Sequence, residues 1–96
     1  MPYIAPGMRK ILEPELNALI KKLDAEHKVD TFDWNAGVLN YLFTKLALVY
    51  IKTKGESYQN YNDIIGALEG CKLELYRQHI QKYEDKKIIT NGDIYE

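Results

Sequence analysis

The residues best suited to bind or react lie along one face of the region 69–83. Glu69, Lys72, Tyr76, His79 and Tyr83 follow one another at steps of three and four residues. In an α-helix this spacing places a carboxylate, an amine, an imidazole and two phenols on one face. The face borders a stripe of apolar residues, so we expect Lys72 and His79 to be partly removed from water, with Glu69 as the acid within reach.

Two interpretations of this face stay open. As the lining of a pocket, Lys72 and Tyr76 grip an anionic or aromatic ligand, and Glu69 serves as a base or metal ligand. As structure alone, Glu69 and Lys72 form an ion pair, and the tyrosines bridge helices through their hydroxyls. The spacing by itself favours the structural interpretation. Nearby, Arg77 either pairs with Glu74 or holds a carboxylate or phosphate through two parallel hydrogen bonds.

A second polar group interrupts an apolar stretch earlier in the chain. Asn40 and Thr44 are one helical turn apart, and so are Tyr41 and Lys45. Buried polar side chains need hydrogen-bond partners. This patch therefore pairs across a helix crossing or subunit interface, or it faces the region 69–83 and closes a cavity between helices. The candidate ligand-binding residues are Asn40, Tyr41, Thr44, Lys45, Glu69, Lys72, Tyr76, Arg77 and Tyr83.

The sequence signatures of common enzymes are absent. There is no glycine-rich phosphate loop, no His-Glu-x-x-His, no nucleophile elbow and no dinucleotide fingerprint. We therefore assign no catalytic residue, no cofactor and no metal site. The enzyme that remains as an alternative is a metal-dependent, all-α nucleotide pyrophosphatase using Asp63, Glu69 and Glu74. The region 34–53 offers no acid to complete such a cluster.

Composition limits the class of protein. The 96 residues fit one domain, 1–96, with 46% hydrophobic and 28% charged residues, as in an ordinary folded protein. A net charge of −1 argues against binding DNA or an anionic membrane surface. The single cysteine, Cys71, excludes an internal disulfide. The apolar stretch 36–51 is too short and too polar to span a membrane, and no signal peptide is evident. We expect a cytoplasmic protein.

Hydrophobic periodicity predicts an all-α domain of three helices. Pro14 is tolerated only in a first helical turn, so the first helix is expected to start near Glu13, after an irregular lead-in. A tail is expected to follow the third helix. The predicted helices span residues 13–28, 34–53 and 58–86.

Capping residues set the predicted boundaries. Asp33 is expected to cap the second helix, and Gly55 to end it. Ser57 or Asn60 is expected to cap the third. The turn dipeptide that starts at Asn91 belongs to a tail, which we expect to pack back on the helices.

The second helix predicts an oligomer. Its residues are apolar on almost every side, and two further helices cannot cover all of them. We therefore expect a homo-oligomer, most simply a two-fold dimer. Gly66 and Gly70 lie one turn apart in the third helix, where each costs roughly 1 kcal/mol against alanine, which favours close approach by a helix or a ligand.

Several motifs together resemble a small family of uncharacterised bacterial and phage helical proteins. The resemblance covers nearly the whole chain, and the family has no established activity. It implies that the two polar regions and the tail belong together, with Asp85, Asn91 and Asp93 closing a cavity or a dimer interface. The relatives tend to have an arginine where Gln78 stands and a proline where Lys82 stands. The matching motifs are Met1-Pro2-Tyr3-Ile4, Leu39-Asn40-Tyr41, Thr44-Lys45, Ser57-Tyr58, the stretch from Asn62 to Glu69, Lys72-Leu73-Glu74, Tyr76-Arg77, Tyr83-Glu84-Asp85 and Asn91-Gly92-Asp93-Ile94-Tyr95.

Three functions follow as expectations. The first is a helical oligomer that binds a small anionic, nucleotide-like ligand, for example a phage protein that sequesters a cyclic nucleotide signal to evade host defence. The second is the metal-dependent pyrophosphatase. The third is a structural or protein-interaction oligomer without a ligand. The expected partners are further copies of the chain and, in the first case, the small ligand.

Overall fold

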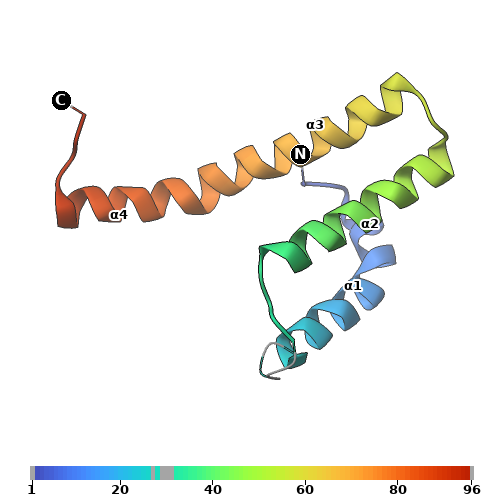
Figure 1. The fold of residues 1–96 in the computed structure, drawn as a ribbon, viewed down its shortest axis with the longest axis horizontal. Helices are drawn as coiled ribbons and strands as arrows, with labels where there is room; N and C mark the ends of the chain where they lie inside the picture. Colours follow the sequence, from blue (N-terminus) through green and yellow to red (C-terminus); the bar gives the residue numbers. More distant parts are fainter. Residues whose placement is uncertain (1, 27, 29–31, 96) are drawn as a thin grey trace.

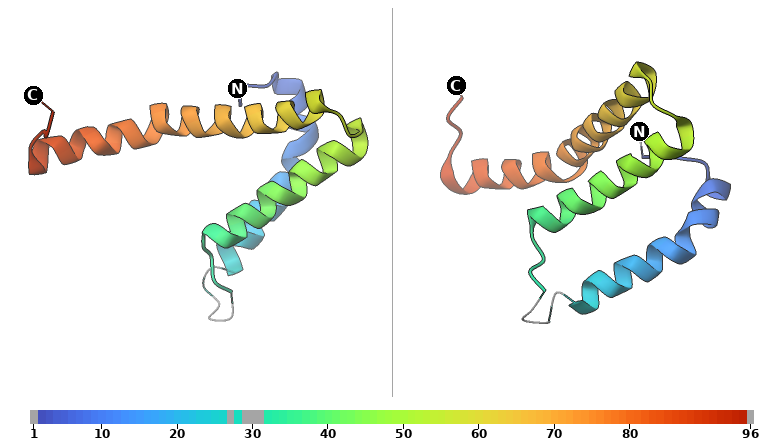
Figure 2. Two further views of the ribbon diagram at one scale, coloured as in Figure 1. Left: turned by 45° about the horizontal axis from the view of Figure 1, so that its top comes forward. Right: turned by 45° about the vertical axis from the view of Figure 1, so that its right-hand side comes forward.

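A computed structural model describes residues 2–26, 28 and 32–95. Figure 1 shows that the described chain is built from helices, joined by short connections. The prediction of an all-α protein with three helices is confirmed, because the last three elements follow one another without a break and form one long rod, which bends between α3 and α4 (Figure 2). In chain order the elements are α1 (Pro6–Glu26), α2 (Ala36–Lys54), α3 (Tyr58–Leu75), the π-helical turn η1 (Tyr76–Ile80) and α4 (Gln81–Asn91).

Helix α1 starts earlier than predicted. It begins at Pro6 rather than near Glu13, and it carries Pro14 in its interior. An interior proline removes one hydrogen-bond donor and crowds the preceding turn, which costs about 3 kcal/mol. The apolar stripe that runs from Met8 through Leu12 to Leu16 continues across the proline, and in the single chain these side chains are exposed. The predicted helix end at 28 is also corrected, because α1 ends at Glu26.

The cap of α2 is Asn35, and the prediction of Asp33 is wrong. Asn35 has extended backbone angles, and its Oδ1 accepts a hydrogen bond from the Val38 N–H at 3.1 Å. Asp33 instead accepts a hydrogen bond from Asn35 Nδ2 at 2.8 Å and so orients the cap. At the other end Gly55 terminates α2 as predicted, with φ +96°, which glycine adopts without a steric penalty.

A tight connection joins α2 to α3. Ser57 caps α3 by accepting a hydrogen bond from the Asn60 N–H at 3.1 Å. The Asn60 side chain donates back to the Gly55 carbonyl at 2.8 Å. Both predicted capping residues are therefore used, in different roles. Figure 2 shows the result, in which α2 and α3 diverge from this corner like the arms of a V.

The prediction that the tail packs back on the helices is wrong. α4 continues to Asn91, beyond the predicted end at 86, and stops at Gly92 with φ +87°. The rod thus carries the C-terminus away from the N-terminus (Figure 1). Ile94 and Tyr95 are 87% and 84% exposed, and Asp93 accepts a hydrogen bond from the Tyr95 N–H at 2.9 Å.

The described chain has no buried core. None of its residues is buried, although every helix carries large apolar side chains. No Cα atom of α1 lies within 8 Å of a Cα atom in another described helix, and α4 approaches only η1, which precedes it. The radius of gyration is 17.4 Å, whereas a compact chain of this length has about 12.5 Å. No helix in this part of the chain has the length and apolar character needed to cross a membrane.

Candidate functional site

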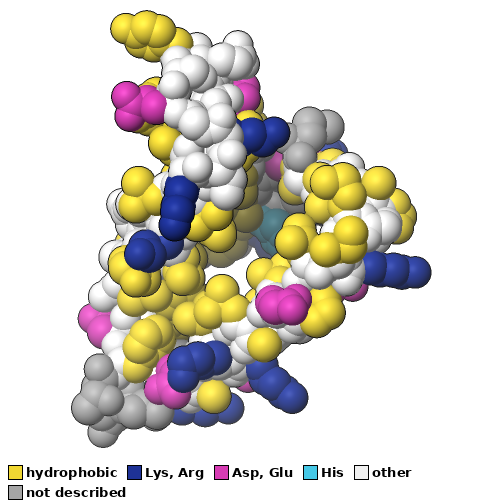
Figure 3. Space-filling model, turned by 90° about the vertical axis from the view of Figure 1, so that its right-hand side faces the viewer, with side chains coloured by type: hydrophobic (Ala, Val, Ile, Leu, Met, Phe, Trp, Pro, Cys, Tyr) yellow, Lys and Arg dark blue, Asp and Glu magenta, His cyan; other side chains and the backbone are white. Residues whose placement is uncertain are grey.

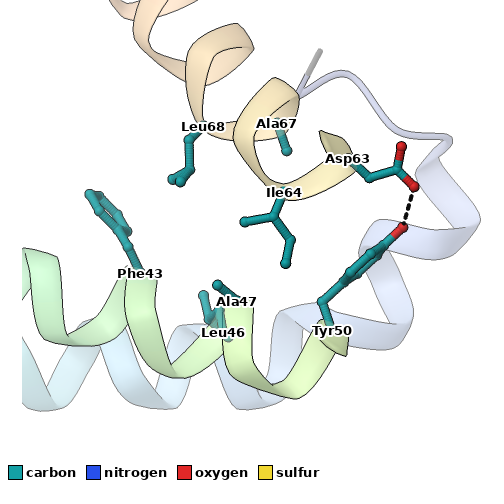
Figure 4. Close-up of a pocket in the computed structure, with 8 residues that line it drawn as sticks. All are labelled: Phe43, Leu46, Ala47, Tyr50, Asp63, Ile64, Ala67 and Leu68. Carbon is teal, nitrogen blue, oxygen red and sulfur yellow. Dashed lines mark hydrogen bonds between the residues drawn. The ribbon is translucent and has the colours of Figure 1, made fainter. Parts of the chain in front are cut away.

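An apolar groove lies between α2 and α3. Its volume is about 360 Å³. Side chains from both arms of the V point into it (Figure 4). It lies where α2 and α3 are close enough to face each other and too far apart for their side chains to fill the space. The groove is lined by Phe43, Leu46, Ala47, Tyr50, Asp63, Ile64, Ala67 and Leu68.

The polar groups of the groove are confined to one end and are already paired. The Tyr50 hydroxyl donates to Asp63 Oδ2 at 3.0 Å, and Gln59 Nε2 donates to Asp63 Oδ1 at 2.7 Å. The hydrogen bond to Asp63, followed by partial desolvation, raises the pKa of Tyr50 above its ordinary value. No cationic side chain is among the groove's lining residues. The groove therefore suits apolar side chains and not a phosphate.

A smaller hollow beside the groove contains half of the predicted α2 patch. Asn40 and Thr44 line it, together with Phe43, Ala47, Leu48 and Leu68. The Thr44 hydroxyl donates to the Asn40 backbone carbonyl at 2.7 Å and so finds its partner within its own helix. Tyr41 and Lys45, each one residue further along α2, are exposed and line neither hollow.

The candidate ligand-binding face that begins at Glu69 and Lys72 is more exposed to solvent than the sequence predicted. Lys72 Nζ lies 3.3 Å from Glu69 Oε1, and the two side chains are 60% and 54% exposed, so such a pair contributes little. His79 is exposed as well. The expectation that Lys72 and His79 are partly removed from water is wrong for the single chain. The reason is geometric, because α2 faces α3 only as far as Leu68 and leaves the rest of the rod uncovered.

Tyr3, Glu74 and Arg77 form a polar cluster on the rod. We call these three residues the clasp. Arg77 Nε donates to Glu74 Oε1 at 2.8 Å, and the Tyr3 hydroxyl donates to the same oxygen at 2.9 Å. These bonds, that of Arg77 first, lower the pKa of Glu74. The predicted Glu74–Arg77 pair is thus present, and the guanidinium considered for an external anion holds a carboxylate of its own chain.

Sequence reasoning missed the role of Tyr3. The residue lies 71 positions before Glu74, and no spacing rule connects positions so far apart. The N-terminal Met-Pro-Tyr-Ile motif of the resemblance was the only signal that this segment matters. The clasp places the start of the chain against the middle of the rod, next to η1 (Figure 1).

The remaining candidates lie at or beyond the π-helical turn. In η1 the Gln81 N–H bonds back to the Tyr76 carbonyl, one residue further than in an α-helix. Such turns occur frequently at functional sites. Tyr76 is half exposed, and Tyr83 lies in α4 with Lys87 Nζ 5.4 Å from the centre of its ring. The structure therefore places Tyr76 and Arg77 in η1, which does not approach α2 and its patch.

Figure 3 views the molecule from the corner where α2 and α3 join. Apolar side chains are exposed over much of this face and surround a central hollow, and charged side chains are interspersed among them. In the part of the chain that the structure describes, no three side chains of His, Cys, Asp or Glu gather closely enough to hold a metal ion.

A family model described as a domain of unknown function, DUF6899, matches residues 1–94. The match covers all the helices and the clasp. Neither a curated protein nor a solved structure matches the chain. The family comparison therefore supports the predicted membership in an uncharacterised family; it does not test a bacterial or phage origin, and it adds no activity.

Proposed function

We propose that this chain, which belongs to the DUF6899 family, works as a protein-interaction module assembled from several of its own copies. The observation that carries the proposal is the lack of any buried residue in the described chain. Apolar surface of this extent is unfavourable in water at about 25 cal/mol per Å². A second copy of the chain is present wherever the first is made. It exposes the same apolar surface, so the two copies can cover each other.

The exposed area supports an obligate assembly rather than a transient one. The chain exposes 8771 Å², whereas a compact monomer of 11.2 kDa exposes about 5,700 Å². The excess is about 3,000 Å², and a standard interface buries only about 800 Å² per partner. Obligate homodimers bury more than standard complexes and have more apolar interfaces. The excess is of the size that such an assembly removes from water.

Sedimentation velocity or light scattering after gel filtration tests the proposal. We expect one species larger than 11.2 kDa down to low micromolar concentration. A folded monomer throughout that range contradicts the proposal.

A second candidate is a site for a small anionic ligand, of the nucleotide kind, at the interface between copies. The supporting observation is that Asn40 and Thr44 line a hollow beside the groove. Tyr41 and Lys45 flank it on the same helix. In the finer form of this candidate, a phage protein in the cytoplasm sequesters a cyclic nucleotide signal.

Calorimetry with a panel of nucleotides and cyclic nucleotides tests the second candidate. Binding that Asn40→Ala or Lys45→Ala abolishes, with an unchanged oligomer, supports it. Glu56→Gln, in the connection between α2 and α3, is the matched control. Absence of heat with every nucleotide at millimolar concentration excludes this class of ligand.

A further inference from the structure

We propose that two copies exchange their first helices, so that α1 of each copy lies in the groove between α2 and α3 of the other. The exchange rests on the proposed function, since it names the surfaces through which the copies assemble. It commits to one occupant of the groove, which is α1 of a second copy. Each copy gives one helix and receives one, as a two-fold dimer requires.

The groove offers an apolar wall on each side. On each helix the apolar lining residues follow one another at steps of three and four, so each wall is a single helical face. Figure 4 shows side chains of both walls pointing toward the same space. A helix that lies there is contacted from two sides. The apolar lining residues are Phe43, Leu46, Ala47 and Tyr50 on α2, and Ile64, Ala67 and Leu68 on α3.

Helix α1 carries an apolar stripe wide enough to contact two helices at once. At about 100° per residue, six of its large apolar side chains lie within an arc of about 120°. A helix that packs against a core has an arc of about 100° or more, whereas two coiled helices need only a narrow seam. Arg9 and Glu26, at the two ends of α1, are the charged residues within the arc. The stripe consists of Met8, Leu12, Leu16, Leu19, Ile20 and Leu23.

This stripe packs against no other described helix of its own chain. Leu12 is 56% exposed, Leu16 49% and Ile20 53%. No Cα atom of α1 lies within 8 Å of a Cα atom in another described helix, and no residue of α1 lines the groove. The clasp holds the segment before α1 on the rod, and the connection to α2 follows its end. Helix α1 is thus held at both ends, outside the groove of its own chain.

The lengths of the three helices match. Helix α1 has 21 residues, α2 has 19 and α3 has 18. At a rise of about 1.5 Å per residue, these helices are about 31, 28 and 27 Å long. The α1 helix of a second copy can therefore run along either arm of the V without leaving part of that arm uncovered.

The exposed surface favours a second copy over an unrelated partner. A foreign helix in the groove leaves the α1 stripe in water, whereas the exchange covers the stripe and the groove of both copies. The chain exposes 8771 Å², which is about 3,000 Å² more than a compact monomer of its mass. A standard interface buries about 800 Å² per partner. Each copy therefore has area for two such contacts, one through its stripe and one through its groove.

Cross-linking tests which helix lies in the groove. Cys71 is free and exposed, and it continues the α3 wall one turn beyond Ala67. Leu16 is the central residue of α1, so its distance to Cys71 is similar in either direction of the inserted helix. We refold the wild-type chain together with a Leu16→Cys, Cys71→Ser variant and add a short bis-maleimide. We expect covalent dimers that link Cys71 to position 16 of the other chain, identified by mass spectrometry.

Two controls accompany the cross-link. Ala18 is two residues from Leu16 and lies on the opposite face of α1. An Ala18→Cys, Cys71→Ser variant should therefore link poorly to the wild-type chain. A Leu16→Cys variant that keeps Cys71 shows whether the two cysteines of one chain also react. A link found only within single chains means that α1 fills its own groove, and this result contradicts the exchange.

A charge placed in the groove provides a second readout. Ala67 lines the groove and is exposed in the single chain, so Ala67→Glu disturbs no core. An inserted helix would bury this carboxylate among apolar side chains. We expect the dimer dissociation constant, measured by sedimentation, to rise about tenfold or more. Asn62→Glu, on the far side of α3, is the matched control and should leave the constant unchanged, and circular dichroism should show the same helix content in both variants.

The outcomes separate the exchange from the proposed function. A wild-type chain that is monomeric contradicts both. A wild-type oligomer without the link between Cys71 and position 16 contradicts only the exchange, and so does an Ala67→Glu variant that associates as tightly as Asn62→Glu. The assembly then uses another surface, such as α4.

Discussion

At the scale of single residues, the clasp is the contact whose chemistry is most clearly defined. Glu74 accepts hydrogen bonds from Arg77 and from Tyr3, which lower its pKa from the ordinary value of 4.5. A carboxyl whose pKa is lower in the folded chain stabilises the fold above its unfolded pKa, and loses that contribution as the pH falls through the folded value. The clasp should therefore hold at neutral pH and open only in acid.

We expect the Tyr3 ring signals in an NMR titration to move to their unclasped positions below pH 4.5, the ordinary value for the carboxyl of Glu74. Tyr3→Phe removes the hydroxyl and keeps the ring, so its spectrum should resemble the unclasped state at every pH. Glu74→Gln should lack the acid transition. A Tyr3 transition that persists in Glu74→Gln assigns the titration to another group.

Two glycines should respond to alanine in opposite directions. A Cβ added at Gly66 meets no atom within 4 Å, so Gly66→Ala should stabilise α3 by about 1 kcal/mol. Gly55 has φ +96°, which an L side chain rarely adopts, so Gly55→Ala should destabilise the chain. Chemical denaturation measures both. A loss of stability in Gly66→Ala indicates that a second chain approaches α3 at this glycine.

At the scale of elements, the cap of α2 offers a direct comparison of two neighbouring side chains. Asn35→Ala removes the acceptor of the Val38 N–H and should cost about 1 kcal/mol in the free energy of unfolding. Asp33→Ala removes only the group that orients the cap, so its cost should be smaller. Equal or reversed costs, measured by urea denaturation, contradict the assignment of Asn35 as the cap.

The sequence predicted the existence of the helices better than their ends. Periodicity located all three, and Gly55 marked one end, because an apolar stripe and a positive φ both leave a local signature. The predicted start of α1 was wrong because it relied on a local rule for Pro14. That rule does not take into account the apolar stripe that continues on both sides of the proline. The π-helical turn has no such signature, since its residues are ordinary helix formers.

At the scale of the whole molecule, assembly should make thermal stability depend on protein concentration. When only the folded assembly contains the interface, mass action stabilises it as concentration rises. We expect the Tm, measured by circular dichroism at 222 nm, to increase as the chain concentration rises from about 5 to about 500 μM. A Tm independent of concentration contradicts an obligate assembly.

The candidate site was predictable in its parts and not in its arrangement. Spacing alone gave the Glu69–Lys72 and Glu74–Arg77 pairs, because residues three apart on a helix are neighbours. The groove depends on how α2 and α3 diverge at Asn60, and the clasp joins distant ends of the chain. Neither feature is local, so neither could be found from residue spacing.

The clasp has a consequence for the order of events in time. Contacts inside helices join near neighbours in sequence and form quickly, whereas the Tyr3–Glu74 hydrogen bond closes a loop of 71 residues. On the ribosome, Tyr3 emerges long before its partner is synthesised. The N-terminal segment therefore waits, unclasped, until the first half of the rod has left the exit tunnel. Refolding in vitro should show the same sequence, with helix formation preceding the change in the environment of Tyr3.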